Sequence, residues 1–209
     1  TDFYVFDKQT KSVEGLEGLI KIGVLCNNAS IENGLVGDPT EAALLFAARK
    51  AGVEKSVLEK SYPFVTEIPF SSERKRMTIV RRDGGKKIAY VKGATEIILD
   101  RCSKKYQNGK VSVLTKNEKE KILKANEEFA SKALRVLAFA YRDVSNLKKY
   151  DEKIVEKDLV FVGLMGMIDP PRDEAIGSIK TCQKAGIKIV MITGDHANTA
   201  KAIADQIGI

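Results

Sequence analysis

Residues 76–93, "RMTIVRRDGGKKIAYVKG", decide the fold of the surrounding chain, because two apolar-rich runs flank Asp83, Gly84 and Gly85. The glycines that follow the aspartate permit the positive φ angles of a tight turn, so this stretch predicts a β-hairpin. A second turn signal, Asn108 with Gly109, predicts another hairpin. We therefore expect an antiparallel sheet in this region.

Helical patterns lie on both sides of these hairpins. In "GDPTEAALLFAARKAG", residues 37–52, Asp38 stands at the N-cap, Pro39 at the first helical position and Gly52 just past the end. A short helix is predicted over 94–102, and a charged amphipathic helix over 116 to about 134 leads into a strand-like run. This part of the chain is therefore predicted to be an α+β domain, an antiparallel sheet with helices.

The last third of the chain has a different pattern. "DLVFVGLMGMID", residues 158–169, is almost uninterruptedly apolar, as expected for a strand that is buried on both faces. After "DPPR" the pattern predicts a helix over about 173–185, a strand over about 187–192 and a helix over about 197–207. This βα alternation is typical of a parallel α/β sheet, although the segment is too short for a complete doubly wound domain. We place the boundary between residues 168 and 169.

Size and composition limit the class of protein. At 209 residues, with 44% of them hydrophobic, the chain can bury a core. It has no apolar run of about 18 residues and no leader, so we expect a soluble piece, and its start without methionine suggests a cut from a longer protein. The spacing of Cys26, Cys102 and Cys182 suits neither a metal site nor disulfides, and favours a reducing compartment.

The net charge of +7 is unevenly distributed. Residues 159–209 hold five Lys/Arg and five Asp/Glu, so the remaining 30 basic and 23 acidic residues, and the whole excess, lie in 1–158. Such an excess suits a nucleotide, a nucleic acid or an acidic membrane surface, and it is also common on a solvated surface. Charge alone does not choose among these partners.

Several short motifs carry residue types that suit the binding of a nucleotide. The sequence contains no P-loop, and no GxGxxG motif follows a predicted strand. Each also has a structural explanation: Glu41 can complete a capping box, Asp195 can cap a helix, and the lone His196 reads as a surface residue. The motifs are "GDPTEAAL" with Thr40 and Glu41, "PFSSERKRM" with Phe70, Ser72, Arg74, Lys75 and Met77, "VKGA" with Lys92 and Gly93, "LRVLAFA" with Arg135, "DPPR" with Arg172, and "TGD" with Thr193, Gly194 and Asp195.

In this combination and order, from about Leu25 to Ile209, the motifs resemble those of the P-type cation-transporting ATPases, in the branch of calcium pumps and sodium/potassium pumps. In that family a nucleotide-binding domain is inserted, through two hinge strands, into a phosphorylation domain of the haloacid-dehalogenase type. "MIDPPR" resembles the second hinge, and "TGDHANTAKAIADQIGI" resembles the continuation of the phosphorylation domain. The resemblance thus implies a nucleotide-binding domain at 1–168, and a hinge with a partial, haloacid-dehalogenase-like (Rossmann-type) segment at 169–209.

The resemblance also implies roles for the first group of motif residues. Phe70 would stack on adenine, a contact that tolerates any flat ring, and Glu41 would accept a hydrogen bond from the adenine amino group. Lys92 would form the floor of the pocket, and Gly93 beside it would admit the base because it has no side chain. The other implied ATP contacts are Thr40, Ser72 and Met77 in the pocket, Lys75 near the phosphates and Arg135 near the β-phosphate or ribose.

A second group of residues is implied at the phosphate end. Thr193, Gly194 and Asp195 follow a predicted strand and precede a helix, which suits an anion site. By resemblance they receive the γ-phosphate when the domains close, with Asp195 close to Mg²⁺. Arg172, at the hinge, would help to bring the domains together over the nucleotide.

Two motifs of the family are absent from this chain. It contains neither the Asp-Lys-Thr-Gly-Thr motif of the phosphorylated aspartate nor the Gly-Asp-Gly-x-Asn-Asp magnesium motif. The resemblance therefore implies the ATP-binding part of a pump that couples ATP hydrolysis, through an aspartyl phosphate, to cation transport, with calcium as the expected cation. Its cofactors would be ATP and Mg²⁺. Its partners would be the transmembrane, actuator and remaining phosphorylation segments of the same protein, on the cytoplasmic side of a membrane.

Two other functions compete with this interpretation. A nucleic-acid-binding module would use the same basic excess, but acidic residues such as Glu73 and Asp83 interrupt the basic ones. A phosphatase of the haloacid-dehalogenase class fits "MITGD", but it needs an early aspartate nucleophile that this chain does not supply. Saturable binding of ATP would distinguish the pump fragment from both.

Overall fold

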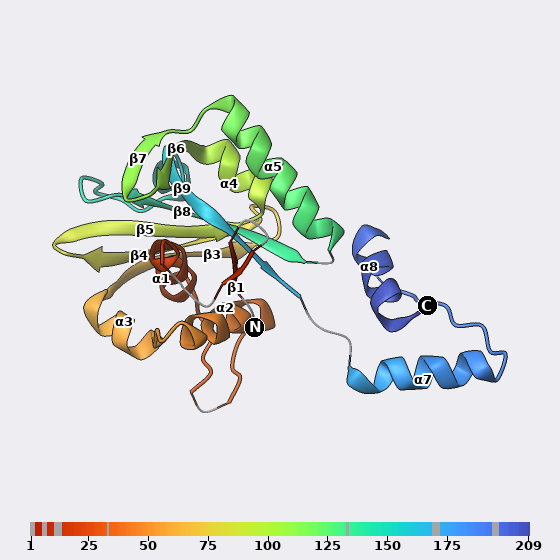
Figure 1. Cartoon of the computed structure of the whole chain (residues 1–209). Coiled ribbons are helices and arrows are strands. Elements are labelled where there is room, and N and C mark those ends of the chain that lie inside the picture. Colours follow the sequence, from red (N-terminus) through yellow and green to blue (C-terminus); the bar gives the residue numbers. More distant parts are fainter. Residues whose placement is uncertain are drawn as a thin grey trace. The chain divides into compact units, whose positions relative to one another are not determined.

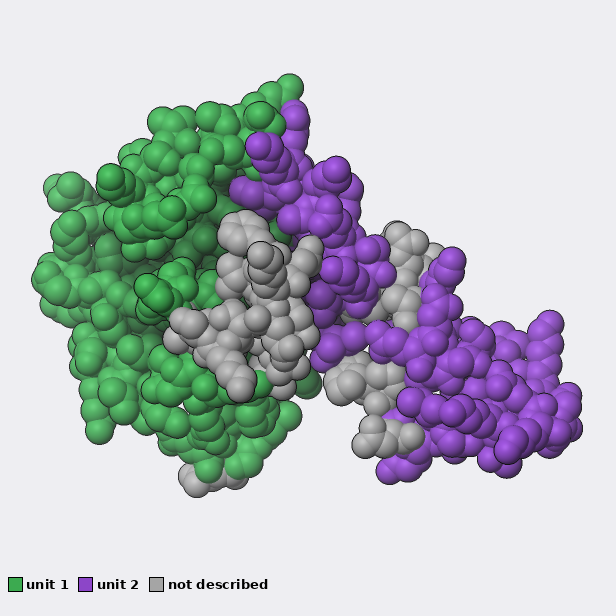
Figure 2. Space-filling model, viewed as in Figure 1, with its two compact units in different colours: residues 1–119, 137–165 green, residues 120–136, 166–209 purple. Residues whose placement is uncertain are grey.

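The computed structural model describes residues 3–5, 8–10, 14–32, 34–132, 134–168, 172–193 and 197–209. The chain divides into two compact units, coloured separately in Figure 2. Unit 1 comprises residues 1–119 and 137–165, and unit 2 comprises residues 120–136 and 166–209. The predicted boundary between 168 and 169 stays a prediction.

Among the described residues, seven strands form one sheet in the order β3-β4-β5-β8-β9-β6-β7. Most neighbouring pairs with a recorded register are antiparallel, as predicted, but β6 pairs with β9 in parallel. The sheet is therefore mixed, and the expectation of a purely antiparallel sheet is wrong at this pair. The strands are β3 Phe64–Ser71, β4 Arg76–Asp83, β5 Lys86–Gly93, β6 Cys102–Gln107, β7 Lys110–Val113, β8 Arg135–Asp143 and β9 Leu159–Met167.

The hairpin of β4 and β5 forms as the sequence predicts. Its strands pair without a break from Asp83 opposite Lys86 to Arg76 opposite Gly93. Gly84 and Gly85 have φ angles of 54° and 85°, the positive values that a tight two-residue turn between twisted strands needs. The second predicted hairpin also forms, as β6 and β7 joined through Asn108 and Gly109.

Helix α2, Pro39–Lys50, confirms the predicted start signal. The Asp38 side chain accepts hydrogen bonds from the backbone N–H groups of Thr40 at 2.7 Å and Glu41 at 3.3 Å. This N-cap satisfies two donors that have no partner within the helix. The other elements are the strands β1 Phe3–Val5 and β2 Lys8–Thr10, and the helices α1 Glu17–Leu25, α3 Lys55–Ser61, α4 Thr95–Arg101, α5 Lys116–Ser131, α6 Glu152–Val155, α7 Asp173–Lys184 and α8 Ala197–Ile207.

The two faces of the β4–β5 hairpin have different coverings. Helices α1, α2 and α3 lie on one side of the sheet in Figure 1, and Arg81 Nε of β4 donates to the Leu25 carbonyl at 2.8 Å. On the other face, Val80 packs in one apolar cluster with Val144 and Val155. Because side chains alternate along a strand, neighbouring residues of β4 serve different faces.

In unit 2, helices α7 and α8 form at the predicted places, but the predicted strand at 187–192 does not. A strand needs a hydrogen-bonded neighbour, and no strand of the described chain pairs with this stretch. Three of its apolar residues are accordingly exposed to solvent: Ile187, Val190 and, to 94%, Ile192. The sequence pattern indicated an apolar stretch correctly, but the strand that it predicted is absent from this part of the described chain.

No helix in the described part of the chain combines the length and the apolar character that crossing a bilayer requires.

A carboxylate at the start of α5 makes the stability of the fold depend on pH. Thr115 and Glu118 form a reciprocal capping box, and Lys105 Nζ lies 2.5 Å from Glu118 Oε1. The hydrogen bond from Lys105, followed by those from Thr115, lowers the pKa of Glu118 to about 2. A carboxylate whose pKa is lowered on folding stabilises the fold above its ordinary pKa, and that contribution is lost as the pH falls through the folded value.

We therefore expect Glu118→Gln to lower the melting temperature at about pH 6, with the difference from the wild type shrinking toward about pH 2. Thermal melts across this pH range, followed by circular dichroism, measure that difference. A difference that does not change with pH would show that the charge of Glu118 contributes nothing.

Candidate functional site

An ion pair between Lys92 and Glu41 lies on the face of the sheet that α1 and α2 cover. Lys92 is in β5, Glu41 is in the first turn of α2, and Lys92 Nζ lies 2.5 Å from Glu41 Oε1. The two side chains are only 7% and 14% exposed. Charges attract more strongly where little water screens them. The ion pair is therefore a well-ordered polar contact on a mainly apolar face of the sheet.

The second carboxylate oxygen of Glu41 extends this polar contact. Glu41 Oε2 accepts from the backbone N–H of Asn28 at 3.0 Å, and Asn28 Nδ2 donates to Glu67 Oε1 at 2.8 Å. The Glu41 carbonyl also accepts from Asn27 Nδ2 at 2.8 Å. One carboxylate thus ties the loop after α1 to α2 and β5, and it engages Lys92 and Asn28 rather than acting as a simple helix cap.

Cys26 lies beside this ion pair as a buried thiol. Its Sγ donates to the Met77 carbonyl at 3.7 Å. Burial raises the pKa of Cys26 to about 11, while the positive charge of Lys92 acts in the opposite direction. Cys26 is therefore a protonated, weakly polar packing residue at neutral pH.

Phe70 lies in a β-bulge of β3, where Pro69 and Phe70 together oppose the single residue Met77 of β4. A bulge redirects the side chains of the bulged strand and is frequent beside functional sites. The Phe70 ring is 62% exposed, whereas Met77 is buried and pairs with Lys92 across the next strand. Phe70, Met77 and Lys92 therefore lie on successive strands at one level of the sheet.

Ser72 and Lys75 lie in the turn that joins β3 to β4. Lys75 has a positive φ of 52°, and its carbonyl accepts from the backbone N–H of Ala94 at 3.0 Å. A Cβ atom at Gly93 would lie 2.5 Å from that same carbonyl oxygen. The absence of a side chain at Gly93 is therefore required by the approach of this turn.

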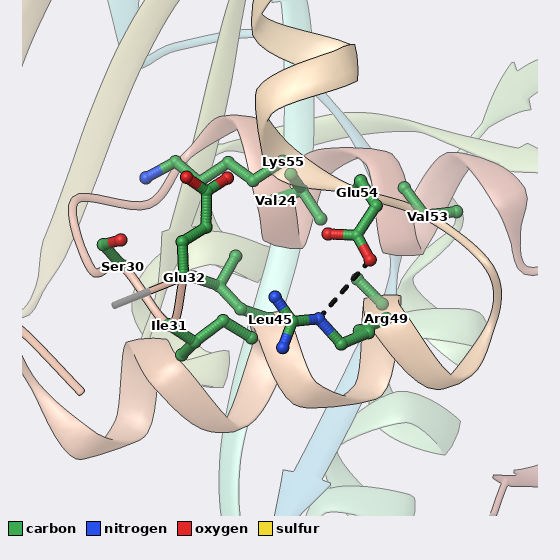
Figure 3. A pocket seen from close by; sticks show the side chains of 10 residues that line it. Val24, Ser30, Ile31, Glu32, Leu45, Arg49, Val53, Glu54 and Lys55 are labelled. Atoms are coloured by element: carbon green, nitrogen blue, oxygen red, sulfur yellow. Dashed lines mark ion pairs between the residues drawn. The ribbon is translucent and has the colours of Figure 1, made fainter. Parts of the chain in front are cut away.

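Two hollows in the described part of unit 1 do not coincide with these residues. The one in Figure 3 has a volume of about 20 Å³, room for about one water molecule, and Arg49 and Glu54 form an ion pair of 3.4 Å beside it. A hollow of about 550 Å³ beside Arg76 and Glu156 is lined by four basic and four acidic residues, so it offers no net charge to a polyphosphate. The exposed ring and the buried pair indicate a ligand site better than these hollows do.

Lys55, which lines the hollow of Figure 3, stabilises the loop next to the candidate site. Its Nζ donates to the carbonyls of Asn27 at 2.9 Å and Ala29 at 2.8 Å, which fixes the loop that carries Asn28. Burial is the main cause that lowers the pKa of Lys55. The loop is thus held by a lysine that gives most of its donors to backbone carbonyls.

Unit 1 contains eight of the predicted site residues, whose binding roles stay predictions: Thr40, Glu41, Phe70, Ser72, Lys75, Met77, Lys92 and Gly93. Arg135, Arg172 and Thr193 belong to unit 2, and their roles stay predictions. Gly194, Asp195 and His196 lie outside the described residues. Sequence reasoning missed Asn28 and Glu67, which no local pattern marks, because their contacts join segments that are 13 and 39 residues apart.

The mixed seven-stranded sheet with its helices fits the nucleotide-binding domain of a P-type ATPase. The family model described as "P-type ATPase, cytoplasmic domain N" matches residues 15–174, most of the chain. The chain belongs to this family.

Relatives among well-described proteins agree with the family match. The chain is 45% identical over 193 residues to "Calcium-transporting ATPase 1" of Lactococcus lactis and 46% identical over 192 residues to the protein of that name from Bacillus cereus. It is 43% identical over 198 residues to "Calcium-transporting ATPase" of Bacillus subtilis. These matches cover 91%, 91% and 92% of the chain, but the chain spans only 22% of the length of each relative.

Proposed function

We propose that this chain holds ATP for a P-type pump that couples ATP hydrolysis, through an aspartyl phosphate, to cation transport, with calcium as the cation. The family match and the names of the relatives support this proposal. The observation that carries it is the row of Phe70, Met77 and Lys92, in which an exposed ring in a bulge shares one level of the sheet with a buried ion pair.

The row offers complementary contacts to adenine. The face of Phe70 stacks on the base, since base–aromatic stacking contributes roughly 1–3 kcal/mol. The Glu41 carboxylate accepts a hydrogen bond from the exocyclic amino group, and its existing bonds to Lys92 and Asn28 keep it oriented. Lys92 forms the floor of the pocket, and Met77, opposite it in the sheet, supplies an apolar and adaptable contact.

The polyphosphate of the bound ATP is proposed to extend toward basic side chains. Lys75 is proposed as a flexible point charge near the phosphates, with Ser72 as a hydroxyl partner in the same turn, and Arg135 as a planar donor toward the β-phosphate or ribose. Thr40 completes the pocket at the start of α2.

Transfer of the γ-phosphate is proposed to depend on the second part of the chain. Arg172 would help to bring the domains together at the hinge, and Thr193, Gly194 and Asp195 would bind the γ-phosphate, with Asp195 close to the Mg²⁺ that the nucleotide would carry. We also propose that residues 169–209 form part of a haloacid-dehalogenase-like domain. Their contribution is positioning and charge neutralisation, which dominate the catalysis of phosphoryl transfer.

Calorimetric titration of the chain with ATP, alone and with a short DNA duplex as competitor, tests this function at two salt concentrations. We expect saturable binding of ATP at one site, displacement of DNA by ATP, and a modest salt dependence. Binding to a polyanion patch would instead fall steeply with salt for both ligands, because it releases counterions from DNA. That result would overturn the proposal in favour of a charged surface.

A further inference from the structure

Glu156, the residue that follows α6, is a buried acid for which the proposed ATP contacts have no use. Its side chain is 0% exposed. Its Oε1 accepts from Thr78 Oγ1 at 2.7 Å, and its Oε2 lies 2.5 Å from Arg76 Nε. Arg74 Nη1 donates to both oxygens, at 2.9 and 3.1 Å. The carboxylate is thus fully engaged by two arginines and a hydroxyl group.

Arg74 connects this acid to the turn between β3 and β4. Its Nη2 donates to the carbonyl of Pro69, the residue before Phe70. The same nitrogen donates to the carbonyl of Arg76, the residue after Lys75, at 3.3 Å. Its Nε lies 3.2 Å from Glu152 Oε2 in α6. One guanidinium group therefore holds both ends of the turn and is itself held by α6.

We propose that Arg74 and Glu156 form a positioning clamp, defined by these two residues, that fixes the Phe70 ring for stacking on adenine. This inference rests on the proposed function. Arg74 does not touch the nucleotide in this scheme and acts through the Pro69 carbonyl on the neighbouring Phe70. Ordering an exposed turn costs conformational entropy, and a turn ordered in advance spares the ligand that cost.

The burial of the clamp favours a positioning role. A buried ion pair adds little net stability compared with apolar residues of similar size, because both charges lose their hydration. A planar guanidinium with five donors does, however, impose one geometry on the carbonyls and carboxylates around it. The two carbonyls that it selects, those of Pro69 and Arg76, flank the segment that contains Phe70 at the end of β3 and Lys75 in the turn.

The decisive variant is Arg74→Lys, because lysine keeps the charge beside Glu156 but cannot span the carbonyls and the carboxylate at once. We expect ATP affinity, measured by calorimetry on the whole chain, to fall roughly tenfold, which corresponds to the cost of immobilising one or two side chains. The matched control is Arg82→Lys, the same change at an exposed position of β4, where affinity should not change.

A double-mutant cycle with Phe70→Ala separates positioning from a general structural role. If the clamp acts through the ring, Arg74→Lys will cause no further loss of ATP affinity in the Phe70→Ala background. An equal loss in both backgrounds overturns the proposal. So does normal ATP binding by Arg74→Lys, or failure of this variant to fold, because the clamp would then serve no ligand or only the fold.

The same titrations distinguish the two levels of inference. Normal ATP binding by Phe70→Ala overturns the adenine site itself, and with it the proposed function. Weak binding by Phe70→Ala together with normal binding by Arg74→Lys overturns the clamp alone.

Discussion

Phe70→Ala is expected to weaken ATP binding by about 1–3 kcal/mol, roughly five- to 150-fold, with almost no change in melting temperature. The large effect on binding follows from the loss of the stacking surface, because alanine presents no ring to the base. The small effect on stability follows from exposure, since a ring that is 62% exposed contributes little to the core. A binding loss without a stability loss is the signature of a residue that contacts ligand.

Phe64→Ala is the matched control for this variant. Phe64 is also in β3 and is 56% exposed, but it lies at the start of the strand and outside the bulge. Calorimetric titration of the two variants with ATP should give normal affinity for Phe64→Ala. Equal losses in both would show that any exposed ring of β3 attracts the nucleotide, and unchanged affinity in Phe70→Ala would remove the ring from the site.

The parts of the fold that the sequence predicts well are held by local interactions. Gly84 and Gly85 define a turn between adjoining strands, and Asp38 caps a helix through N–H groups two and three residues away. Each of these signals lies within a few residues of the structure that it determines. The turn between β4 and β5 and the N-cap of α2 were therefore predictable without knowledge of the tertiary structure.

The predictions that were wrong depended on distant pairing. The parallel partnership of β6 with β9 joins residues that are more than 50 positions apart, and hydrophobic periodicity carries no information about strand direction. The apolar run at 187–192 looked like a strand, but no strand of the described residues pairs with it. Periodicity identifies which side chains prefer burial and cannot identify the neighbour that buries them.

The candidate site shows the same division. Phe70, Lys92 and Glu41 were selected from the sequence by resemblance to a family, and no spacing would have joined them. The contacts of Asn28 with Glu41 and of Glu156 with Arg74 were not predicted, because they connect segments 13 and 82 residues apart. Residues that contact a candidate site from distant segments leave a weaker trace in the sequence than the motif residues that the family resemblance selects.

Gly93→Ala is the second variant for which we expect a large effect, and the effect should be on stability. The new Cβ would lie 2.5 Å from the Lys75 carbonyl oxygen and 2.6 Å from Arg76 Cβ, with Arg76 Cα at 2.9 Å. Two of these atoms are backbone, so no rotation of a side chain relieves the contact. Overpacking of this kind costs about 1–3 kcal/mol or more, which exceeds the small entropic gain of replacing glycine.

Urea unfolding of Gly93→Ala and of a control, Gly163→Ala, measures this cost. Gly163 also lies in the sheet, but its added Cβ would meet Leu19 methyl groups at 3.2 and 3.3 Å, and a leucine side chain can shift. We expect the control to lose about 1 kcal/mol at most. The family resemblance suggested that Gly93 admits the nucleotide; if that were its main role, Gly93→Ala would keep its stability and lose ATP binding. Loss of stability instead assigns the glycine to the close approach of the turn, whose Lys75 carbonyl accepts from the backbone N–H of Ala94.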